Sequence, residues 1–213
     1  MGWERKQGLS RTIYLLRHGE TEWNKKKLFQ GQTDIPLDEA GIEQARACRE
    51  MAESLHLSFD RVYASPLKRA LETTEIVSGL PKEKIMTDRR LMEMDFGPID
   101  GTPFDKESPD CGLLFQDPDR YVPAAGAESF PALRARLASF FADLAEGPGE
   151  RILVGSHGCA IRCMLVNFGY LKLHDIWQQH IPNCTLIEVQ PAPDSTFQVG
   201  KFLEISQFSS KHV

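Results

Sequence analysis

The sequence predicts an α/β fold, in which helices cover one central sheet. Short apolar runs rich in strand-forming residues alternate with longer segments that carry apolar residues at helical spacing. Two of the apolar runs, residues 12–17 and 151–156, are each followed directly by a histidine and a glycine. Alternating strands and helices, without internal repeats or low-complexity linkers, are typical of one domain with parallel strands. We therefore expect residues 1–213 to form a single α/β domain.

The chain opens with a strand and then a helix. The run over residues 12–17 is short and apolar, and Gly19 after it permits a sharp turn. Apolar residues at helical spacing then extend from Glu39 to Leu55. Asp38 is the expected N-cap of this helix, because an aspartate accepts hydrogen bonds from the free N–H groups of a first turn. The three lysines at 25–27 are expected in a solvated loop.

A second strand and helix come next. Residues 61–65 form the expected strand, and a helix should run from Pro66 to about Ser78. Ser65 suits its N-cap and Pro66 its first helical position. A third short strand is expected over residues 85–87.

Residues 98–126 break the pattern. They are rich in Pro, Gly and Asp and are too long for a simple turn, so we expect a flap or lid near a functional site. Helical spacing returns from Ser129 to Leu144, and the Gly-Pro-Gly run at 147–149 should end that helix.

The last part of the chain repeats the opening unit. A strand over residues 151–156 ends in His157-Gly158, and an apolar helix is expected from about Cys159 to Phe168. Two late strands, over 185–189 and 197–205, are expected at sheet edges.

Composition and charge narrow the class of protein. Hydrophobic residues make up 41% and charged residues 26% of the 213 residues, which is typical of soluble globular proteins. A formal net charge of -5 argues against general binding to nucleic acid or to an anionic membrane. The five cysteines include no CxxC pair, which favours free thiols in a reducing cytoplasm. With neither an apolar signal segment nor a stretch of spanning length, we expect a cytoplasmic protein.

Cationic and imidazole side chains stand at three strand ends. These are Arg17 with His18, Arg69 just after the second strand, and His157. If the strands are parallel neighbours, the groups converge at one edge of the sheet, where the N-termini of the following helices add N–H donors. Planar guanidinium forks match phosphate oxygens, so the pattern predicts a site for a phosphoryl group.

The motifs around these residues resemble those of the histidine phosphatase superfamily, which has the phosphoglycerate mutase-like fold. The similarity covers residues 12 to about 160 and appears in the order of the family. It is carried by Leu16-Arg17-His18-Gly19-Glu20-Thr21 with Trp23-Asn24, Ser65-Pro66-Leu67-Lys68-Arg69-Ala70 with Thr73, Leu91-Met92-Glu93 before Phe96-Gly97, and Gly155-Ser156-His157-Gly158. The resemblance implies a three-layer α/β/α sandwich with a mostly parallel central sheet.

The resemblance also implies a role for each matching residue. His18 would be the nucleophile that forms a phosphohistidine, and Glu93 would be the general acid and then the general base. Further residues would bind the substrate or line the pocket beside Glu93, namely Arg17, Asn24, Gln30, Gly31, Thr33, Arg69 and His157. The expected function is a phosphomonoester hydrolase that needs neither metal nor cofactor. Its expected partner is a small phosphorylated substrate, with no nucleic acid or membrane, and a homodimer is one possible assembly.

Some alternatives stay open. From spacing alone Glu93 reads as a surface carboxylate in the charged run 88–90, and Asp95 is a rival acid. Departures from the family pattern at Pro98-Ile99-Asp100-Gly101 and at 125–129 leave the substrate undetermined.

Three rival functions are also considered. A phosphoglycerate mutase would return the phosphoryl group to its substrate, but the Glu-Arg-His-Tyr-Gly typical of such mutases is replaced here by residues 93–97, Glu-Met-Asp-Phe-Gly. A metallohydrolase would use His18, His157 and Glu93 as ligands. A catalytically silent binding module would not need all of these residues.

Overall fold

A six-stranded sheet forms the centre of the molecule. The computed structural model describes residues 11–105, 111–192 and 196–208. The strands lie in the order β3-β2-β4-β1-β5-β6. Their bounds are β1 Thr12–Arg17, β2 Arg61–Ala64, β3 Met86–Thr87, β4 Arg151–Ser156, β5 Leu186–Pro191 and β6 Phe197–Leu203.

The sheet is mixed. The pairings β1–β4, β2–β4 and β2–β3 are parallel, as expected for strands that alternate with helices. The pairings β1–β5 and β5–β6 are antiparallel. Both late strands are present, but only β6 lies at an edge; β5 is inside the sheet between β1 and β6, and the edge position expected for it was wrong.

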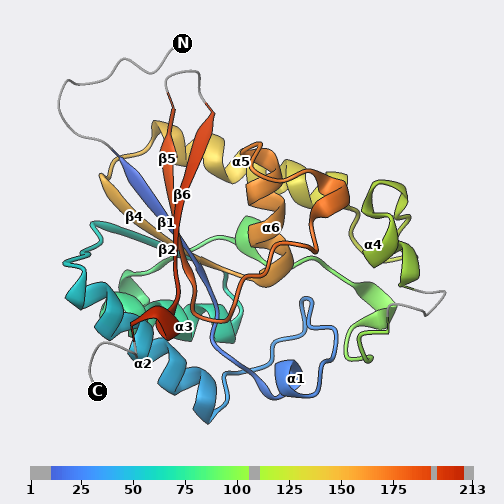
Figure 1. Ribbon diagram of the computed structural model, residues 1–213, viewed down its shortest axis with the longest axis horizontal. Coiled ribbons are helices and arrows are strands. Elements are labelled where there is room, and N and C mark those ends of the chain that lie inside the picture. Colours follow the sequence, from blue (N-terminus) through green and yellow to red (C-terminus); the bar gives the residue numbers. More distant parts are fainter. Residues whose placement is uncertain (1–10, 106–110, 193–195, 209–213) are drawn as a thin grey trace.

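Helices cover both faces of the sheet, which confirms the three-layer arrangement (Figure 1). On one face α2 and α3 pack with Leu16 and Val62. On the other face α5 and α6 pack with Leu15 and Val154. The helices are α1 Glu22–Lys25, α2 Glu39–Ser54, α3 Lys68–Ser78, α4 Gly112–Gln116, α5 Phe130–Glu146 and α6 Gly158–Asn167.

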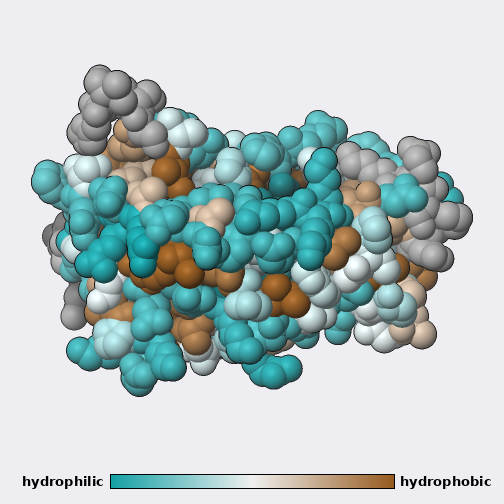
Figure 2. Space-filling model, turned by 90° about the horizontal axis from the view of Figure 1, so that it is seen from below, coloured by the Kyte–Doolittle hydropathy of each residue, from teal (hydrophilic) through white to brown (hydrophobic). Residues whose placement is uncertain are grey.

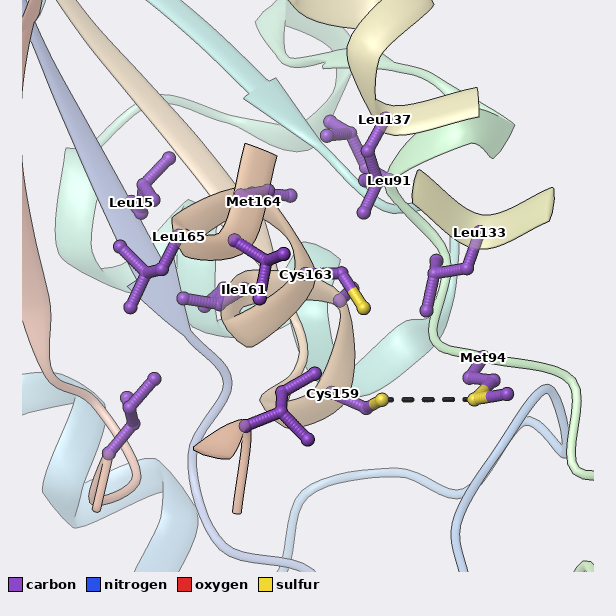
Figure 3. Packing of buried hydrophobic residues seen from close by; sticks show 14 of the residues in the cluster. Leu15, Leu91, Met94, Leu133, Leu137, Cys159, Ile161, Cys163, Met164 and Leu165 are labelled. Carbon is purple, nitrogen blue, oxygen red and sulfur yellow. Dashed lines mark hydrogen bonds between the residues drawn. The ribbon is translucent and has the colours of Figure 1, made fainter. Parts of the chain in front are cut away.

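The helix α6 is buried along most of its length (Figure 3). Its apolar side chains lie between the sheet and α5, and Cys159 Sγ lies 3.8 Å from Met94 Sδ. All five cysteines are free thiols, as the sequence predicted, and all are buried. Burial raises the pKa of the Cys184 thiol to about 12 and that of Cys48 well above its ordinary value, so these thiols are protonated and unreactive at neutral pH.

One of the expected helix caps is confirmed, since Asp38 accepts a hydrogen bond from Gly41 N at 2.8 Å and begins α2. A cap that was not predicted begins α5, where Ser129 accepts a hydrogen bond from Ala132 N at 3.2 Å. The helix α5 ends at Gly147, within the expected Gly-Pro-Gly run.

The expected start of α3 was wrong. The helix begins at Lys68, with Leu67 as its N-cap, and not at Pro66 with Ser65 as its cap. The Ser65 hydroxyl lies 2.7 Å from His157 Nε2. The backbone nitrogen of Leu67 is farther from the same hydroxyl, at 3.4 Å. The free N–H of Lys68 donates instead to Asp34 at 2.7 Å. The Ser65 side chain, which the local sequence predicts as a helix cap, therefore makes a tertiary contact with His157 instead.

The segment predicted as a flap is partly described. Residues 106–110 lie outside the described part, and motion of the segment stays a prediction. Residues 101–104 pack along residues 27–29, through the bonds of Gly101 N to Phe29 O and of Phe29 N to Thr102 O. Phe29 also contacts the rings of Phe104 and Phe115, at centroid distances of 4.5 and 5.8 Å. The described flap is thus attached to the segment that follows α1.

The surface is predominantly polar on the face drawn in Figure 2, with small, separate hydrophobic areas. Among the described residues no helix is both long and apolar enough to cross a membrane.

Candidate active site

The carboxyl ends of three parallel strands meet at one edge of the sheet. Arg17 at the end of β1 pairs with Ser156 of β4, and Ala64 of β2 pairs with Gly155. The ladder continues for one more bond on each side, from His18 N to Ser156 O at 3.1 Å and from Ser65 N to Gly155 O at 2.9 Å. The register therefore brings the residues after each strand together, as the sequence predicted.

Gly19 fixes how the chain leaves β1. A Cβ at this position would lie 2.5 Å from the backbone oxygen of Gly41 in α2, so only glycine fits. Gly19 N also donates to Thr73 Oγ1 of α3, at 2.9 Å. The turn after His18 is thus held by both helices on that face.

His18 is buried, with 4% of its surface exposed. Its Nδ1 lies 2.7 Å from the carbonyl oxygen of Gly19. A carbonyl oxygen only accepts, so Nδ1 carries the proton and the neutral ring keeps its lone pair on Nε2. Burial, and then the charges of Arg69 and Arg17, hold the pKa of His18 well below its ordinary value. The imidazole is therefore neutral at pH 7, with Nε2 available as a nucleophile.

Several buried nitrogen atoms at this edge have no hydrogen-bond partner within the described residues. They belong to predicted site residues and are Arg17 Nε, Arg69 Nε, Gln30 Nε2 and His157 Nδ1. Buried polar atoms are rarely left unpaired in native proteins. All four can donate a hydrogen bond, which is the property required to bind the oxygens of an anion.

The two arginines keep their charge. Burial lowers the pKa of Arg69 to about 10, and burial together with the nearby Arg162 lowers that of Arg17 to about 10. Both groups are protonated at neutral pH. Arg17 Nη1 donates to Ile181 O, whereas its Nε and Nη2 have no partner in the described chain. The side of the guanidinium group that carries Nε and Nη2 can therefore bind an anion with two parallel hydrogen bonds.

Arg69 is fully buried and is oriented by backbone carbonyls. Its Nη1 donates to Thr33 O at 2.9 Å and its Nη2 to Gly31 O at 2.6 Å. Asp100 holds this loop in turn, since its carboxylate accepts bonds from Gly31 N at 2.6 Å and from Thr33 N at 3.1 Å. The structure thus places Gly31 and Thr33 beside Arg69, and the Thr33 side chain itself is exposed.

His157 is buried and lies next to His18, with ring centroids 5.2 Å apart. Its pKa is held well below the ordinary value by burial and then by Arg69, so both imidazoles are neutral. If the Ser65 hydroxyl donates to His157 Nε2, the ring proton is on the unpartnered Nδ1, which can then donate to a ligand. Sequence reasoning missed Ser65 in this position because it took the serine for a helix cap.

Glu93 is 5% exposed and is not the surface carboxylate that spacing alone suggested. Its Oε1 accepts bonds from Met94 N at 2.9 Å and Ala160 N at 2.8 Å, and its Oε2 accepts one from Cys159 N at 3.0 Å. The N-terminus of α6 therefore holds Glu93 and does not present these N–H groups to a phosphate. Asp34 likewise accepts a bond from Lys68 N at the start of α3, so carboxylates occupy some of the donors expected at both helix N-termini.

The rival acid, Asp95, is engaged elsewhere. Its Oδ1 accepts a bond from Gly97 N at 2.9 Å, which stabilises the turn after Phe96. The backbone carbonyl of Glu93 is held by Arg136 Nη2 at 3.0 Å, and Arg136 is itself paired with Glu128. Glu93 is therefore the better anchored of the two carboxylates, and its charge acts on Arg17 and Arg69.

Asn24 lies on the short helix α1, which the sequence did not predict. Its Oδ1 accepts a bond from Thr21 N at 3.2 Å and completes a capping box. The Thr21 hydroxyl lies 3.2 Å from Asn24 Oδ1 and 3.1 Å from Gln30 Oε1, and it can donate its single proton to either oxygen. With its oxygen in use, Asn24 has only its NH₂ group to offer to a ligand.

The ligand set of the metallohydrolase alternative does not converge. Glu93 directs its oxygens to backbone N–H groups, and His18 Nδ1 and His157 Nε2 are already hydrogen-bonded. In the described part of the chain, one group of three possible metal ligands has its atoms within 4.8 Å of one another, and it consists of Asp117, Asp119 and His174. None of these three was a predicted site residue.

Comparison with known proteins identifies the family. Residues 13–201 match the model of the histidine phosphatase superfamily (branch 1), and the chain belongs to this family. It is 34% identical over 154 residues to an uncharacterised phosphatase, PhoE, of Bacillus subtilis, covering 72% of this chain and 75% of that protein. It is 30% identical over 205 residues to a 2,3-bisphosphoglycerate-dependent phosphoglycerate mutase of Brucella anthropi, covering 92% of this chain and all of that protein.

A solved structure supports the same conclusion. YhfR of Bacillus stearothermophilus superimposes with a TM-score of 0.79 at 29% identity, covering 90% of this chain and 96% of that protein. The predicted family and fold are therefore confirmed, and the protein is a histidine phosphatase-superfamily enzyme of the phosphatase and mutase class.

Proposed function

We propose that the protein is a metal-independent phosphomonoester hydrolase that acts on a small phosphorylated metabolite through a phosphohistidine at His18. The observation that carries this proposal is the neutral His18, with its lone pair on Nε2, among buried donors without partners. A phosphoryl transition state needs positioning and charge stabilisation, and the donors of Arg17, Arg69 and His157 supply both.

The first step forms the phosphoenzyme. His18 Nε2 attacks phosphorus and makes an N–P bond while the bond from phosphorus to the leaving oxygen breaks. Glu93, holding a proton, transfers it to that oxygen, and the alcohol departs. Oε2 accepts a single backbone bond and so has room for the proton.

The second step reverses these roles. The Glu93 carboxylate takes a proton from water, the water oxygen attacks phosphorus, and the N–P bond breaks. Inorganic phosphate leaves, and His18 returns to its neutral form with the proton again on Nδ1. Two displacements of this kind replace one difficult step with two easier ones.

A mutase is the second candidate, because one relative is named as a bisphosphoglycerate-dependent phosphoglycerate mutase. The same phosphohistidine would then return its phosphoryl group to substrate. The run Glu93-Met94-Asp95-Phe96-Gly97 supports hydrolysis as the main activity. Stimulation by bisphosphoglycerate, with isomerisation faster than phosphate release, would favour the mutase.

The proposal is tested with phosphorylated metabolites and p-nitrophenyl phosphate, in the presence and absence of a chelator. We expect phosphate release that the chelator does not change and that His18→Ala abolishes. His56→Asn is the matched control, because His56 is exposed and has a left-handed backbone that asparagine tolerates. Loss of activity on chelation, or full activity of His18→Ala, would refute the proposal.

The proposal also covers the compartment, the partners and the assembly of the protein. The net charge and free thiols support a cytoplasmic protein that binds neither nucleic acid nor membrane. A homodimer is proposed as one assembly to be tested by light scattering.

A further inference from the structure

Arg162 is a third cation at the active-site edge, and its charge acts on Arg17. It lies on α6, one helical turn after the N-cap His157. A Cβ built on Gly158 would lie 3.3 Å from Arg162 Nη1 and 3.5 Å from Arg17 Nε. The two guanidinium groups therefore flank the same glycine, and one of them is the proposed phosphate fork.

The Arg162 guanidinium is held firmly but is not neutralised. Its Nε donates to Gln179 O at 3.0 Å and its Nη1 to Gly158 O at 2.8 Å, and its Cζ lies over the Trp177 ring, 5.7 Å from the ring centroid. Its Nη2 has no partner in the part of the chain that the structure describes, and no carboxylate there pairs with it. Side chains with fixed planes and free N–H donors are suited to bind carboxylates.

The segment that positions Arg162 also positions Arg17. Gln179 O holds the first and Ile181 O the second, while Asn183 Nδ2 donates to the His18 carbonyl at 2.8 Å. Arg162 is thus built into the same framework as the nucleophile. A purely structural role, in which Arg162 only ties α6 to this segment, would not require a position beside the guanidinium group of Arg17.

The position of Arg162 points to a second anionic group on the substrate. Arg162 Nη1 and Arg17 Nε lie 3.3 and 3.5 Å from the same point, the Cβ position of Gly158, so the Arg162 guanidinium stands beside the proposed phosphate fork. Its free Nη2 can donate to an anionic group a few bonds away from the phosphoryl group. A carboxylate on the substrate would be such a group.

We propose that Arg162 binds the carboxylate of the substrate, and that the preferred substrates are small phosphorylated carboxylic acids with the two groups a few bonds apart. This inference rests on the proposed phosphatase function and specifies its substrate class. Arg162 would then be a specificity-determining residue, with no part in bond breaking.

The test compares matched pairs of substrates that differ in the carboxylate. The pairs are 3-phosphoglycerate with glycerol 3-phosphate, and O-phosphoserine with O-phosphoethanolamine; p-nitrophenyl phosphate reports the chemistry alone. We expect the unmodified enzyme to favour the carboxylated member by at least about 10-fold in kcat/KM, the effect of one charged hydrogen-bonded pair.

Arg162→Met should remove this preference by raising KM for the carboxylated substrates about 10- to 100-fold, while kcat/KM for p-nitrophenyl phosphate stays within about 3-fold. Arg162→Lys keeps the charge and should restore part of the preference, which guards against misfolding of the methionine variant. Arg46→Met is the control, because it removes an exposed arginine on α2.

Three results would overturn the inference. The unmodified enzyme could hydrolyse both members of each pair equally well. Arg162→Met and Arg162→Lys could lower all five activities alike, which would make Arg162 a structural brace. Failure of the unmodified enzyme to hydrolyse any of the five compounds would instead refute the proposed function, and this inference with it.

Discussion

Glu93 shows how the surroundings of one residue set its chemistry. Its carboxylate is held by three backbone N–H groups, two of them at the start of α6, and its charge acts on Arg17 and Arg69. Backbone groups therefore fix the position of the proposed proton donor without using another side chain.

Replacing Glu93 by Gln should slow hydrolysis of alkyl phosphates about 10²- to 10⁴-fold, because the leaving oxygen then receives no proton. p-Nitrophenolate leaves without a proton, so the phosphoenzyme should still form quickly and break down slowly. Stopped-flow absorbance should show a burst of about one p-nitrophenolate per site, followed by slow turnover.

Asp95→Asn is the matched variant for this measurement. It should keep the turnover of the unmodified enzyme, since Asp95 stabilises a turn. If Asp95→Asn loses activity on alkyl phosphates while Glu93→Gln keeps it, the acid has been chosen wrongly.

Single residues were predictable from the sequence where they follow a strand and stand in a motif, as His18, Arg69 and His157 do. Glu93 follows no strand and was predicted only through the resemblance to the family, since spacing alone favoured a surface carboxylate. The partners of these residues were not predictable, because Ser65 and His157 are 92 residues apart and Asp100 and Gly31 are 69 apart. No local pattern reports a contact of that range, and the departure at Asp100 had seemed to affect only the substrate.

At the scale of elements, the cap of α2 is the clearest case of local sequence deciding structure. Asp38 accepts a bond from Gly41 N and pairs with Lys25 at 2.8 Å. The Lys25 hydrogen bond and the Gly41 N–H outweigh burial and lower the pKa of Asp38. Lys25 is therefore attached to α2, although the run 25–27 was expected to be only a solvated loop.

Asp38→Ala should lower the free energy of unfolding by about 1 kcal/mol, through loss of the cap. Asp38→Asn keeps a capping oxygen and should lose clearly less. Urea denaturation of the three proteins measures both differences. Equal destabilisation by the two substitutions would show that the pair with Lys25, and not the cap, stabilises this end of the helix.

Other elements could be predicted only in part. The bounds of the strands that end at the site and of the long helices α2, α5 and α6 follow from periodicity and caps to within two residues. The start of α3 and the four-residue helix α1 do not, because tertiary contacts of Ser65 and Asp34 decide the first and a short capping box forms the second.

For the whole molecule, the two buried histidines predict how stability depends on pH. Their pKa values lie well below 6.5 in the folded protein and near 6.5 in the unfolded chain. Below about pH 6.5 the unfolded chain binds protons that the folded protein does not, so stability falls as pH falls. The limiting slope is about 1.4 kcal/mol per pH unit for each histidine.

We therefore expect the free energy of unfolding to decrease from pH 6.5 to 5, in a phosphate-free buffer. The variants His18→Asn and His157→Asn should each have a shallower dependence, whereas His56→Asn should follow the unmodified protein. Denaturation at a series of pH values tests this, and an unchanged slope in both active-site variants would contradict it.

The central claim is that the phosphoryl group passes through His18. Its most direct test is to quench the enzyme in alkali during turnover of p-nitrophenyl phosphate, a medium in which phosphohistidine survives, and to map the phosphoryl group by mass spectrometry. The account predicts one phosphoryl group on His18 Nε2, enriched in Glu93→Gln and absent in His18→Ala. Turnover without a phosphoenzyme, or a phosphoryl group on another residue, would contradict it.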